Sequence, residues 1–454
     1  MKKVLIANRG EIACRVMRSC RALSLKTVAV YSEVDAQALH VSQADEAQAI
    51  GPAPAKQSYL VVDNILAAAK ASGADAVHPG YGFLAENSGF AKAVARAGLT
   101  WIGPTPESID DMGDKEQARL LARAAGVPIL PGSVRFAAGD LAGLDEAARA
   151  VGFPLLVKAS AGGGGIGMRR VDRAEDLAKT VEATQALAEK SFGDGTIYLE
   201  RLVARARHVE IQVFGFGDGR AVHMYERECS VQRRFQKIIE ETPSPGLAAE
   251  TRAAMADAAV ALIKQERYRG AGTIEFVVDA DSGAYYFLEM NTRIQVEHPV
   301  TEMTTGLDLV ALQIRLARGD DLSALTQESI RPRGHSIECR LYAENPAMNF
   351  LPSPGPLKRF QLPNGMDGLR IDTGVREGDQ ITFHYDPMIA KMASHGRDRN
   401  EAIARMLAAL GGVHVEGVKT NAAFLRRVID HPAFRAGDTH TGFVAEHGAA
   451  LTKG

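Results

Sequence analysis

The sequence has few cysteines and no surplus of basic residues. It holds 4 cysteines among 454 residues, and none of them forms a Cys-x-x-Cys pair. A zinc ribbon or a disulfide framework is therefore not expected, and each cysteine is predicted to be a small buried apolar side chain. Lysine and arginine number 53 against 55 aspartates and glutamates, a net charge of −2. A protein that coats nucleic acid needs a basic surplus, so we expect no nucleic-acid partner.

Long apolar runs are also missing. The N-terminal apolar stretch at residues 4–7 is too short for a secretory signal, which needs an apolar region of about 7–15 residues. No run approaches the roughly 18 apolar residues of a membrane span. We therefore expect a reduced, cytoplasmic protein that does not bind a membrane. With 46% apolar and 24% charged residues, the chain fits a folded protein of about three domains.

The N-terminal part alternates between predicted strands and helices. Residues 4–7 form a short strand, and Asn8 is placed to cap a helix that carries Ile12 and Val16 on one stripe. Further predicted elements are a strand at 27–31, a helix at 64–71, a strand at 76–78, a helix at 90–97 and a strand at 100–103. Strands that alternate with helices in this way predict a doubly wound parallel sheet.

The remaining chain divides into two further sections. Asp114 is placed to cap another helix, with Gln117 completing a capping box, and the loop at 128–132 is a candidate boundary. Beyond it, strands are predicted at 155–158, 196–200, 209–214, 273–278 and 285–290. The part from about residue 331 is rich in turn residues and is expected to be mostly strand before a helix at 399–410.

A glycine-rich stretch at 158–171 is the most distinctive segment. It formally contains Gly-x-Gly-x-x-Gly between Gly162 and Gly167, but residues 168–171 are typical of a strand where a dinucleotide fingerprint needs a helix. It is not a Walker loop either, because no Gly-Lys-Ser/Thr follows. A glycine loop between two strands predicts a mobile flap whose N–H groups close over phosphates, beside the charge of Lys158. A flexible surface turn is the alternative.

Acidic and amide side chains recur in the segment 285–298. If the segment stays extended, one face carries five polar residues: Glu289, Asn291, Arg293, Gln295 and Glu297. Glu275, in the preceding strand, is placed to lie opposite Glu289. Two carboxylates and an amide oxygen are hard ligands that suit Mg²⁺ (or Mn²⁺) bridging nucleotide phosphates. The alternative is the solvated face of an antiparallel strand.

Two further polar segments are less specific. The mixed-charge segment 226–237 is predicted to be a solvated loop, with a cationic site for a small anion as the alternative. His208, Glu210 and Gln212 alternate with apolar residues, which indicates a strand with one polar face. Taken alone, such a histidine is a structural residue.

Together and in this order, these segments resemble biotin carboxylase, the ATP-grasp component of biotin-dependent carboxylases. The resemblance covers essentially the whole chain, and its motifs lie at 6–13, 78–84, 112–115, 158–171, 207–213 and 289–301. It implies an α/β and α+β multidomain fold. The implied parts are a Rossmann-like N-terminal domain (1–114), an ATP-grasp domain (115–330) with a flap subdomain at about 131–203, and a mainly β C-terminal domain (331–454).

The resemblance also implies an activity, the ATP-driven carboxylation of biotin by bicarbonate through carboxyphosphate. Glu297 is then the base that deprotonates bicarbonate, and Arg340 stabilises the biotin enolate beside Tyr81. The implied bicarbonate site is Lys237, Arg293, Gln295 and Val296, and the implied metal ligands are Glu275, Glu289 and Asn291. The implied ATP contacts are Lys115, Lys158, Gly163, Gly164, Gly165, Gly167, Met168, Glu200, Arg201, Val203, His208, Gln232, Glu275 and Glu289, with the Phe235 position near the ribose.

Partners follow from the same resemblance. The biotinyl carrier signature Ala/Val-Met-Lys-Met is absent and the chain ends about where the carboxylase component does. We therefore expect biotin to arrive on a separate carrier protein, with carboxyltransferase subunits as further partners and a homodimer as the family assembly. The expected final acceptor is an acyl-CoA such as acetyl-CoA.

Two positions depart from the family pattern. Ile166 stands where many members carry Arg or Lys, which also resembles the urea-carboxylase branch, and Phe235 stands where His or Asn is common. Another ATP-grasp ligase that joins a carboxylate to an amine, and a non-catalytic nucleotide-binding subunit, are the alternatives from other classes. A Rossmann dehydrogenase is disfavoured, because the turn at 8–11 lacks the glycine triplet.

Overall fold

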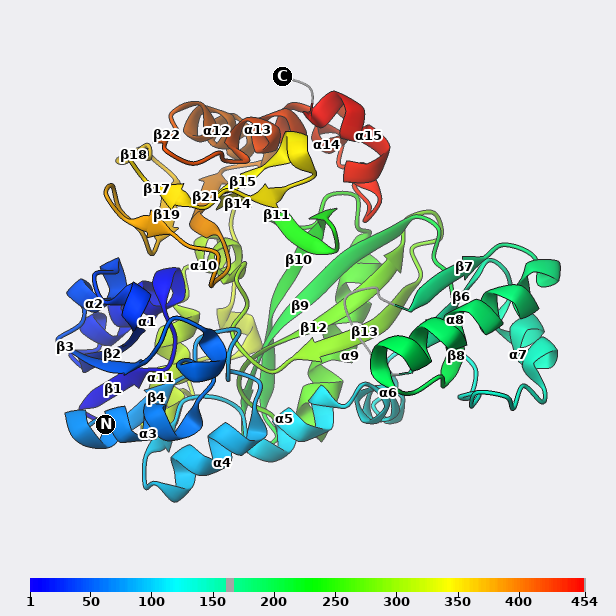
Figure 1. Cartoon of the computed structure of the whole chain (residues 1–454), viewed down its shortest axis with the longest axis horizontal. Helices are drawn as coiled ribbons and strands as arrows, with labels where there is room; N and C mark the ends of the chain where they lie inside the picture. The colour runs from blue at the N-terminus through cyan, green and yellow to red at the C-terminus, as the bar shows by residue number, and fades with distance from the viewer. Residues whose placement is uncertain (161–166, 453–454) are drawn as a thin grey trace.

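The computed structural model describes residues 1–160 and 167–452, and its N-terminal part is a parallel sheet (Figure 1). The strands are β1 (Lys3–Ile6), β2 (Lys26–Ser32), β3 (Glu46–Gly51), β4 (Ala76–His78) and β5 (Thr100–Trp101), in the order β3-β2-β1-β4-β5. The helices between and after them are α1 (Gly10–Ala22), α2 (Leu39–Gln43), α3 (Val62–Ser72), α4 (Ser88–Arg96) and α5 (Pro106–Gly113). Every strand pair is parallel, so the predicted parallel sheet is confirmed.

Asn8 does not cap α1, which corrects the prediction. The N-cap residue is Arg9, and its side chain makes no cap hydrogen bond. Asn8 instead donates through Nδ2 to the carbonyl oxygens of Pro79 (2.8 Å) and Tyr81 (2.7 Å). Two carbonyl acceptors in reach satisfy both N–H groups of this buried amide. The side chain therefore fixes the loop that carries Tyr81 against the start of α1.

An eight-stranded antiparallel sheet joins the middle and C-terminal parts of the chain. Its order is β13-β12-β9-β10-β11-β14-β21-β19. The strands are β9 (Ala206–Phe216), β10 (Ala221–Arg233), β11 (Gln236–Thr242), β12 (Arg269–Asp279), β13 (Tyr285–Asn291), β14 (His335–Tyr342), β19 (Leu369–Thr373) and β21 (Met388–Gly396). The helices α9 (Ala249–Gln265), α10 (His298–Thr305) and α11 (Leu309–Arg318) pack around it. Because β11 pairs with β14, one sheet crosses the predicted boundary at residue 330, and the domain limits stay a prediction.

The segment 226–237 is a hairpin whose residues 226–231 are buried and whose turn at 234–236 is exposed, so its prediction as a solvated loop was wrong. It forms the end of β10 and the start of β11, which pair in an antiparallel ladder. Arg227 is fully buried and pairs with Glu210 on the neighbouring strand β9. Charges that find partners on adjacent strands are tolerated inside a protein, although their sequence reads like a solvent-exposed stretch.

A three-stranded sheet with its own core projects to one side of the molecule (Figure 1). Its strands are β6 (Leu155–Ala159), β7 (Met168–Val171) and β8 (Ile197–Arg201), with helices α7 (Leu144–Val151) and α8 (Leu177–Phe192). The helix α6 (Lys115–Ala124) precedes it, and Asp114 caps α6 by accepting hydrogen bonds from the N–H groups of Glu116 and Gln117. The glycines 162–165 and Ile166, between β6 and β7, lie outside the described residues.

Short strands and helices complete the C-terminal part. They are β15 (Glu344–Asn345), β16 (Leu351–Pro352), β17 (Gly355–Pro356), β18 (Arg359–Gln361), β20 (Gln380–Ile381), β22 (His414–Glu416), α12 (Arg399–Gly411), α13 (Ala422–Asp430), α14 (Pro432–Arg435) and α15 (Phe443–Thr452). All four cysteines are free thiols; three are buried and Cys14 is half-buried. Among the helices described in residues 1–160 and 167–452, none has the length and apolarity needed to cross a membrane.

Candidate active site

A cavity of about 1650 Å³ lies where the parallel sheet, the eight-stranded sheet and the C-terminal part meet. Its walls come from the start of α1, the loop after β4, the polar faces of β9 to β14 and the loop before β21. Most of the residues predicted from the sequence line it: Tyr81, Met168, His208, Gln232, Phe235, Lys237, Glu275, Glu289, Asn291, Arg293, Gln295, Val296, Glu297 and Arg340. Segments far apart in the sequence therefore meet at one place.

Several predicted ATP contacts stand away from this cavity. Of the described residues, Lys115, Lys158, Gly167, Glu200, Arg201 and Val203 are absent from its lining. Lys158 and Glu200 belong to the three-stranded sheet, where Lys158 Nζ lies 2.5 Å from Glu200 Oε1. Lys115 is exposed at the first position of α6. The predicted contacts Gly163, Gly164 and Gly165 lie outside the described residues.

Glu275 and Glu289 are direct partners across the β12–β13 ladder, as predicted. One oxygen of Glu275 accepts hydrogen bonds from Lys237 (2.7 Å), Asn291 (2.9 Å) and Gln295 (3.1 Å). The other oxygen lies 3.0 Å from His208 Nε2. Burial and the neighbouring charge of Glu275 raise the pKa of Glu289. Two carboxylates and an amide oxygen with this excess of negative charge fit a divalent cation such as Mg²⁺ or Mn²⁺.

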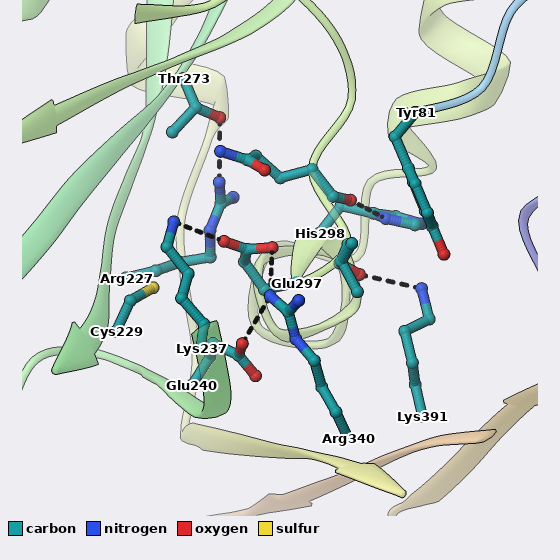
Figure 2. Close-up of polar contacts among 12 residues, drawn as sticks. Tyr81, Arg227, Cys229, Lys237, Glu240, Thr273, Glu297, His298, Arg340 and Lys391 are labelled. Carbon is teal, nitrogen blue, oxygen red and sulfur yellow. Dashed lines mark hydrogen bonds and ion pairs between the residues drawn. The ribbon is translucent and has the colours of Figure 1, made fainter. Parts of the chain in front are cut away.

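Glu297 is fully buried at the N-cap position of α10 and lies between two cations (Figure 2). Its Oε1 accepts a hydrogen bond from Lys237 Nζ at 2.9 Å, and its Oε2 accepts one from Arg340 Nη2 at 2.9 Å. Burial disfavours the charged form, but Lys237, Arg340 and Arg227 outweigh it and hold the pKa of Glu297 well below its usual range. Glu297 is therefore a carboxylate at neutral pH.

Lys237 bridges three carboxylates at the centre of the site. Its Nζ lies 2.6 Å from Glu210, 2.7 Å from Glu275 and 2.9 Å from Glu297. Burial works against the charged form, yet these three anions hold the pKa of Lys237 well above its ordinary value. The ammonium group links the candidate metal ligands to the candidate base. A small anion that enters this region meets a fixed positive charge.

Arg227, which the sequence prediction missed, holds Glu210 in place behind Lys237. Its Nε lies 2.5 Å from Glu210 Oε1, and it also donates to Gln212, Thr273 and Thr301. The side chain is fully buried. The pairing of β10 with β9 places Arg227 opposite Glu210, and no local sequence signal gives that register.

The segment after Asn291 leaves the strand, so the expectation of one extended face is wrong beyond that residue. β13 ends at Asn291, and residues 292–297 form an irregular loop before α10. The predicted residues still converge through side-chain contacts. Arg293 donates to Asn291 Oδ1 and Gln295 Oε1, each at 2.8 Å, and through Nε to Glu86 Oε2 at 2.8 Å. Hydrogen bonds, rather than strand periodicity, bring this group together.

Tyr81 belongs to a network that includes two residues the sequence analysis did not select, Glu11 and Lys391. The hydroxyl of Tyr81 donates to Glu11 Oε2 at 2.6 Å, and Lys391 Nζ lies 3.1 Å from Glu11 Oε1. Lys391 also donates to the carbonyl oxygen of Val296 at 2.9 Å (Figure 2). Their partners lie on remote segments, so no local sequence signal marks them.

His208, Gln232 and Phe235 lie at the edge of the cavity. Gln232 Nε2 and His208 Nδ1 are 3.1 Å apart, so these two predicted nucleotide contacts are linked. Phe235 stands at the turn between β10 and β11, and 74% of its surface is exposed. Its ring offers an apolar surface and no hydrogen bond at this position.

Comparison with known families identifies the chain. Residues 1–109 match the model of the biotin carboxylase N-terminal domain, and residues 338–446 match that of the biotin carboxylase C-terminal domain. Residues 114–325 match the ATP-binding domain of the carbamoyl-phosphate synthase L chain. The chain belongs to the biotin carboxylase family. It is an ATP-dependent ligase of that family, as the resemblance predicted.

Relatives of biotin carboxylase match nearly the whole chain. Biotin carboxylase 1 of Bacillus subtilis is 49% identical over 447 residues, 98% of each chain. The mitochondrial methylcrotonoyl-CoA carboxylase subunit alpha of Dictyostelium discoideum is 50% identical over 449 residues, which are 99% of this chain and 64% of that protein. A similar solved structure is the biotin carboxylase domain dimer of Hydrogenobacter thermophilus 2-oxoglutarate carboxylase, in complex with MgADP, ADP and bicarbonate. It is 44% identical to this chain, and the two superpose with a TM-score of 0.91 over 100% of this chain and 99% of that chain.

Proposed function

We propose that this biotin carboxylase carries out the MgATP- and bicarbonate-dependent carboxylation of biotin. The observation that carries the proposal is Glu297, a buried carboxylate held between Lys237 and Arg340, next to the acidic pair of Glu275 and Glu289 in one cavity. A base, an anion site and a metal-binding pair therefore adjoin one another. The bicarbonate and MgADP found with the Hydrogenobacter relative support the same assignment.

Glu297 is proposed to take the proton of bicarbonate. The low pKa of Glu297 depends on Lys237, Arg340 and Arg227. Bicarbonate bound by Lys237, Arg293, Gln295 and Val296 would share that positive charge. Because less positive charge then stabilises the carboxylate, the affinity of Glu297 for a proton rises when bicarbonate, the proton donor, is bound beside it. The deprotonated bicarbonate oxygen attacks the γ-phosphorus of ATP, a new O–P bond forms, the bond to ADP breaks, and carboxyphosphate results.

Glu275, Glu289 and Asn291 would hold the divalent cation. When bound, the cation neutralises charge on the phosphates and orients them. The chain's own residues prepare this position: Lys237 and His208 keep Glu275 ionised, and Arg293 orients the amide of Asn291. The two carboxylates repel each other without a cation, which is the physical reason that they would bind one.

The three-stranded sheet is proposed to close over the nucleotide. Lys115, Lys158, Gly163, Gly164, Gly165, Gly167, Met168, Glu200, Arg201, Val203, His208 and Gln232 stay proposed ATP contacts. Of these, Met168, His208 and Gln232 already line the cavity. Closure would let Lys158 exchange its contact with Glu200 for a phosphate and would exclude water from carboxyphosphate, which hydrolyses readily.

Arg340 and Tyr81 are proposed to bind biotin. Arg340 would place its guanidinium at the ureido oxygen and stabilise the enolate that forms when the ring nitrogen loses its proton. The nitrogen then forms a bond to the carboxyl carbon of carboxyphosphate, the bond from that carbon to the phosphate oxygen breaks, and phosphate leaves with the proton. We propose that biotin is supplied by a separate carrier protein, that carboxyltransferase subunits take the carboxyl group on to an acyl-CoA, and that the chain forms a homodimer. The acyl-CoA acceptor is supported by the methylcrotonoyl-CoA carboxylase relatives. The amine-ligase alternative is not favoured, and the cytoplasmic location stays a prediction.

The experiment is an assay of ADP release by the purified chain with MgATP. Release should require bicarbonate and should increase when free biotin is added. Omission of bicarbonate is the control. ADP release that is indifferent to both bicarbonate and biotin would overturn the proposal.

A further inference from the structure

Arg340 has a second carboxylate partner that lies outside the cavity lining. Its Nη2 is 2.9 Å from Glu297 Oε2 and 2.6 Å from Glu240 Oε1, so the guanidinium lies between two anions (Figure 2). Glu240 is on β11, fully buried, and is not among the residues that line the cavity. Arg340 is its only ion-pair partner among the described residues, and neither oxygen of Glu240 accepts a hydrogen bond from a described group, so the contact with Arg340 is an ion pair. The proposed reaction assigns no role to this carboxylate.

We propose that Glu240 is a positioning residue that holds the guanidinium of Arg340 directed at the biotin site while Glu297 carries the proton of bicarbonate. This inference rests on the proposed function. Arg340 loses the charge of one of its two anions when Glu297 becomes neutral. A long, flexible side chain then needs another anchor, because otherwise it would turn toward the new anions in the cavity. Glu240 provides that anchor from the side away from the substrates.

A neighbouring carboxyl group sharpens the argument. Glu338 is the cross-strand partner of Glu240 on β14 and is also fully buried. Neither oxygen of Glu338 has a hydrogen-bond partner among the described residues. Burial, together with the charge of Glu240, raises the pKa of Glu338 well above its usual range, although Lys391 and Arg340 oppose this. Burial thus disfavours the negative charge on Glu338, and Glu240 is the carboxyl group of this pair that is in contact with Arg340.

The charged groups that face Glu240 come from three places. They are Arg340 and Glu338 on β14, Glu297 at the start of α10, and Lys237 on its own strand. Burial is the largest influence and raises the pKa of Glu240 to about 7, with Glu297 adding to the rise and Arg340 and Lys237 opposing it. Glu240 therefore changes its charge near neutral pH. In the same pH range, and before bicarbonate binds, Glu297 stays ionised.

The test compares Glu240→Gln with Glu338→Gln in the full chain. Both changes keep the shape and remove the ability to ionise, so Glu338→Gln is a matched control that should stay within about twofold of wild type. With saturating MgATP and bicarbonate, Glu240→Gln should keep the ADP release seen without biotin. Its biotin-stimulated kcat should fall by at least about tenfold, with the KM for MgATP unchanged.

The pH profile gives a second readout that a merely structural role would not change. Wild-type biotin-stimulated activity should decline below about pH 7 as Glu240 takes up a proton, and Glu240→Gln should lack this decline. Glu240→Asp, which retains the charge, should recover part of the biotin stimulation. Its recovery also separates loss of the anchor from a failure to fold.

Three outcomes would count against the inference. If biotin stimulates Glu240→Gln as strongly as it stimulates wild type, the role of Glu240 is overturned and the proposed function is not affected. Equal losses in Glu240→Gln and Glu338→Gln, with the same decrease in thermal midpoint and no recovery in Glu240→Asp, would assign both residues to folding instead. A wild-type protein without biotin stimulation would overturn the proposed function, and with it this role for Glu240.

Discussion

Lys391 donates a 2.9 Å hydrogen bond to the carbonyl oxygen of Val296, across two parts of the chain that are 95 residues apart. The same ammonium group lies 3.1 Å from Glu11 Oε1, and Glu11 accepts the hydroxyl proton of Tyr81. Lys391 is 1% exposed. One buried lysine therefore connects the first helix, the loop before α10 and strand β21 behind the proposed bicarbonate site.

Lys391→Met should weaken bicarbonate binding and destabilise the fold. The change leaves Glu11 buried without its cation, which typically costs about 3–5 kcal/mol. It also frees the Val296 carbonyl, so the KM for bicarbonate should rise by about tenfold while the KM for MgATP changes little. Steady-state kinetics and thermal unfolding measure the two effects. Lys419→Met, at an exposed lysine of the same part of the chain, is the control, and identical behaviour of both variants would contradict the role of Lys391.

Glu297→Gln should bind MgATP normally but lose most of its turnover. The amide keeps the shape of the side chain and cannot accept the proton of bicarbonate, so bicarbonate-dependent ADP release should fall by about 10²–10⁴-fold. Calorimetry measures the binding of MgATP, and a coupled assay of ADP release measures turnover, so the two effects are measured separately. Glu328→Gln, at an exposed position, should behave like wild type. Wild-type turnover in Glu297→Gln would remove Glu297 as the base.

Local periodicity predicted the regular elements well. The strand at 76–78 and the strand at 168–171 have the predicted bounds, and Glu275 lies opposite Glu289 as the alternation indicated. These features depend on neighbouring residues, on a side-chain repeat of two and on turn residues at the ends. Sequence alone is sufficient where the determining interactions are local.

The buried ion pairs could not be predicted in the same way. Arg227, Glu240, Glu11 and Lys391 each find their partners on other strands or helices, and the residues of the mixed-charge hairpin carry the composition of a solvated loop. Their burial becomes favourable only when the strand order β9-β10-β11-β14-β21 is known. Charged side chains are usually exposed to solvent, and this general expectation fails where side chains of opposite charge pair within a buried sheet.

Glu289→Gln and Glu275→Gln should weaken the divalent cation site. Either change removes one charge from the acidic pair, so the affinity for Mn²⁺ in the presence of ADP should fall by about tenfold or more. Glu275→Gln should also disturb turnover at saturating metal, because Glu275 binds Lys237 and lies against His208. Calorimetric titration with Mn²⁺ measures the affinity. Asp281→Asn, in the turn of the same hairpin, is the control, and unchanged Mn²⁺ affinity in both glutamate variants would exclude this pair as ligands.

Acid should destabilise the N-terminal part before the carboxylates titrate. Burial lowers the pKa of His40 and of His78 from 6.5 to about 4. The unfolded chain therefore binds protons between about pH 6.5 and pH 4 that the folded chain does not, and the free energy of unfolding decreases as the pH falls through that window. Each histidine accounts for up to about 3 kcal/mol of this loss at full protonation of the unfolded state.

Trp101 offers a direct measurement of that pH dependence. It is the single tryptophan of the sequence, is 7% exposed and lies on β5, next to the strand β4 that carries His78 and in the sheet against which His40 packs. Urea unfolding followed by its fluorescence should show a lower midpoint at pH 5 than at pH 7. His40→Gln cannot take up a proton in this range, so the difference between the two midpoints should shrink in that variant. Equal midpoints at both pH values in the wild-type chain would show that neither histidine is held neutral by burial.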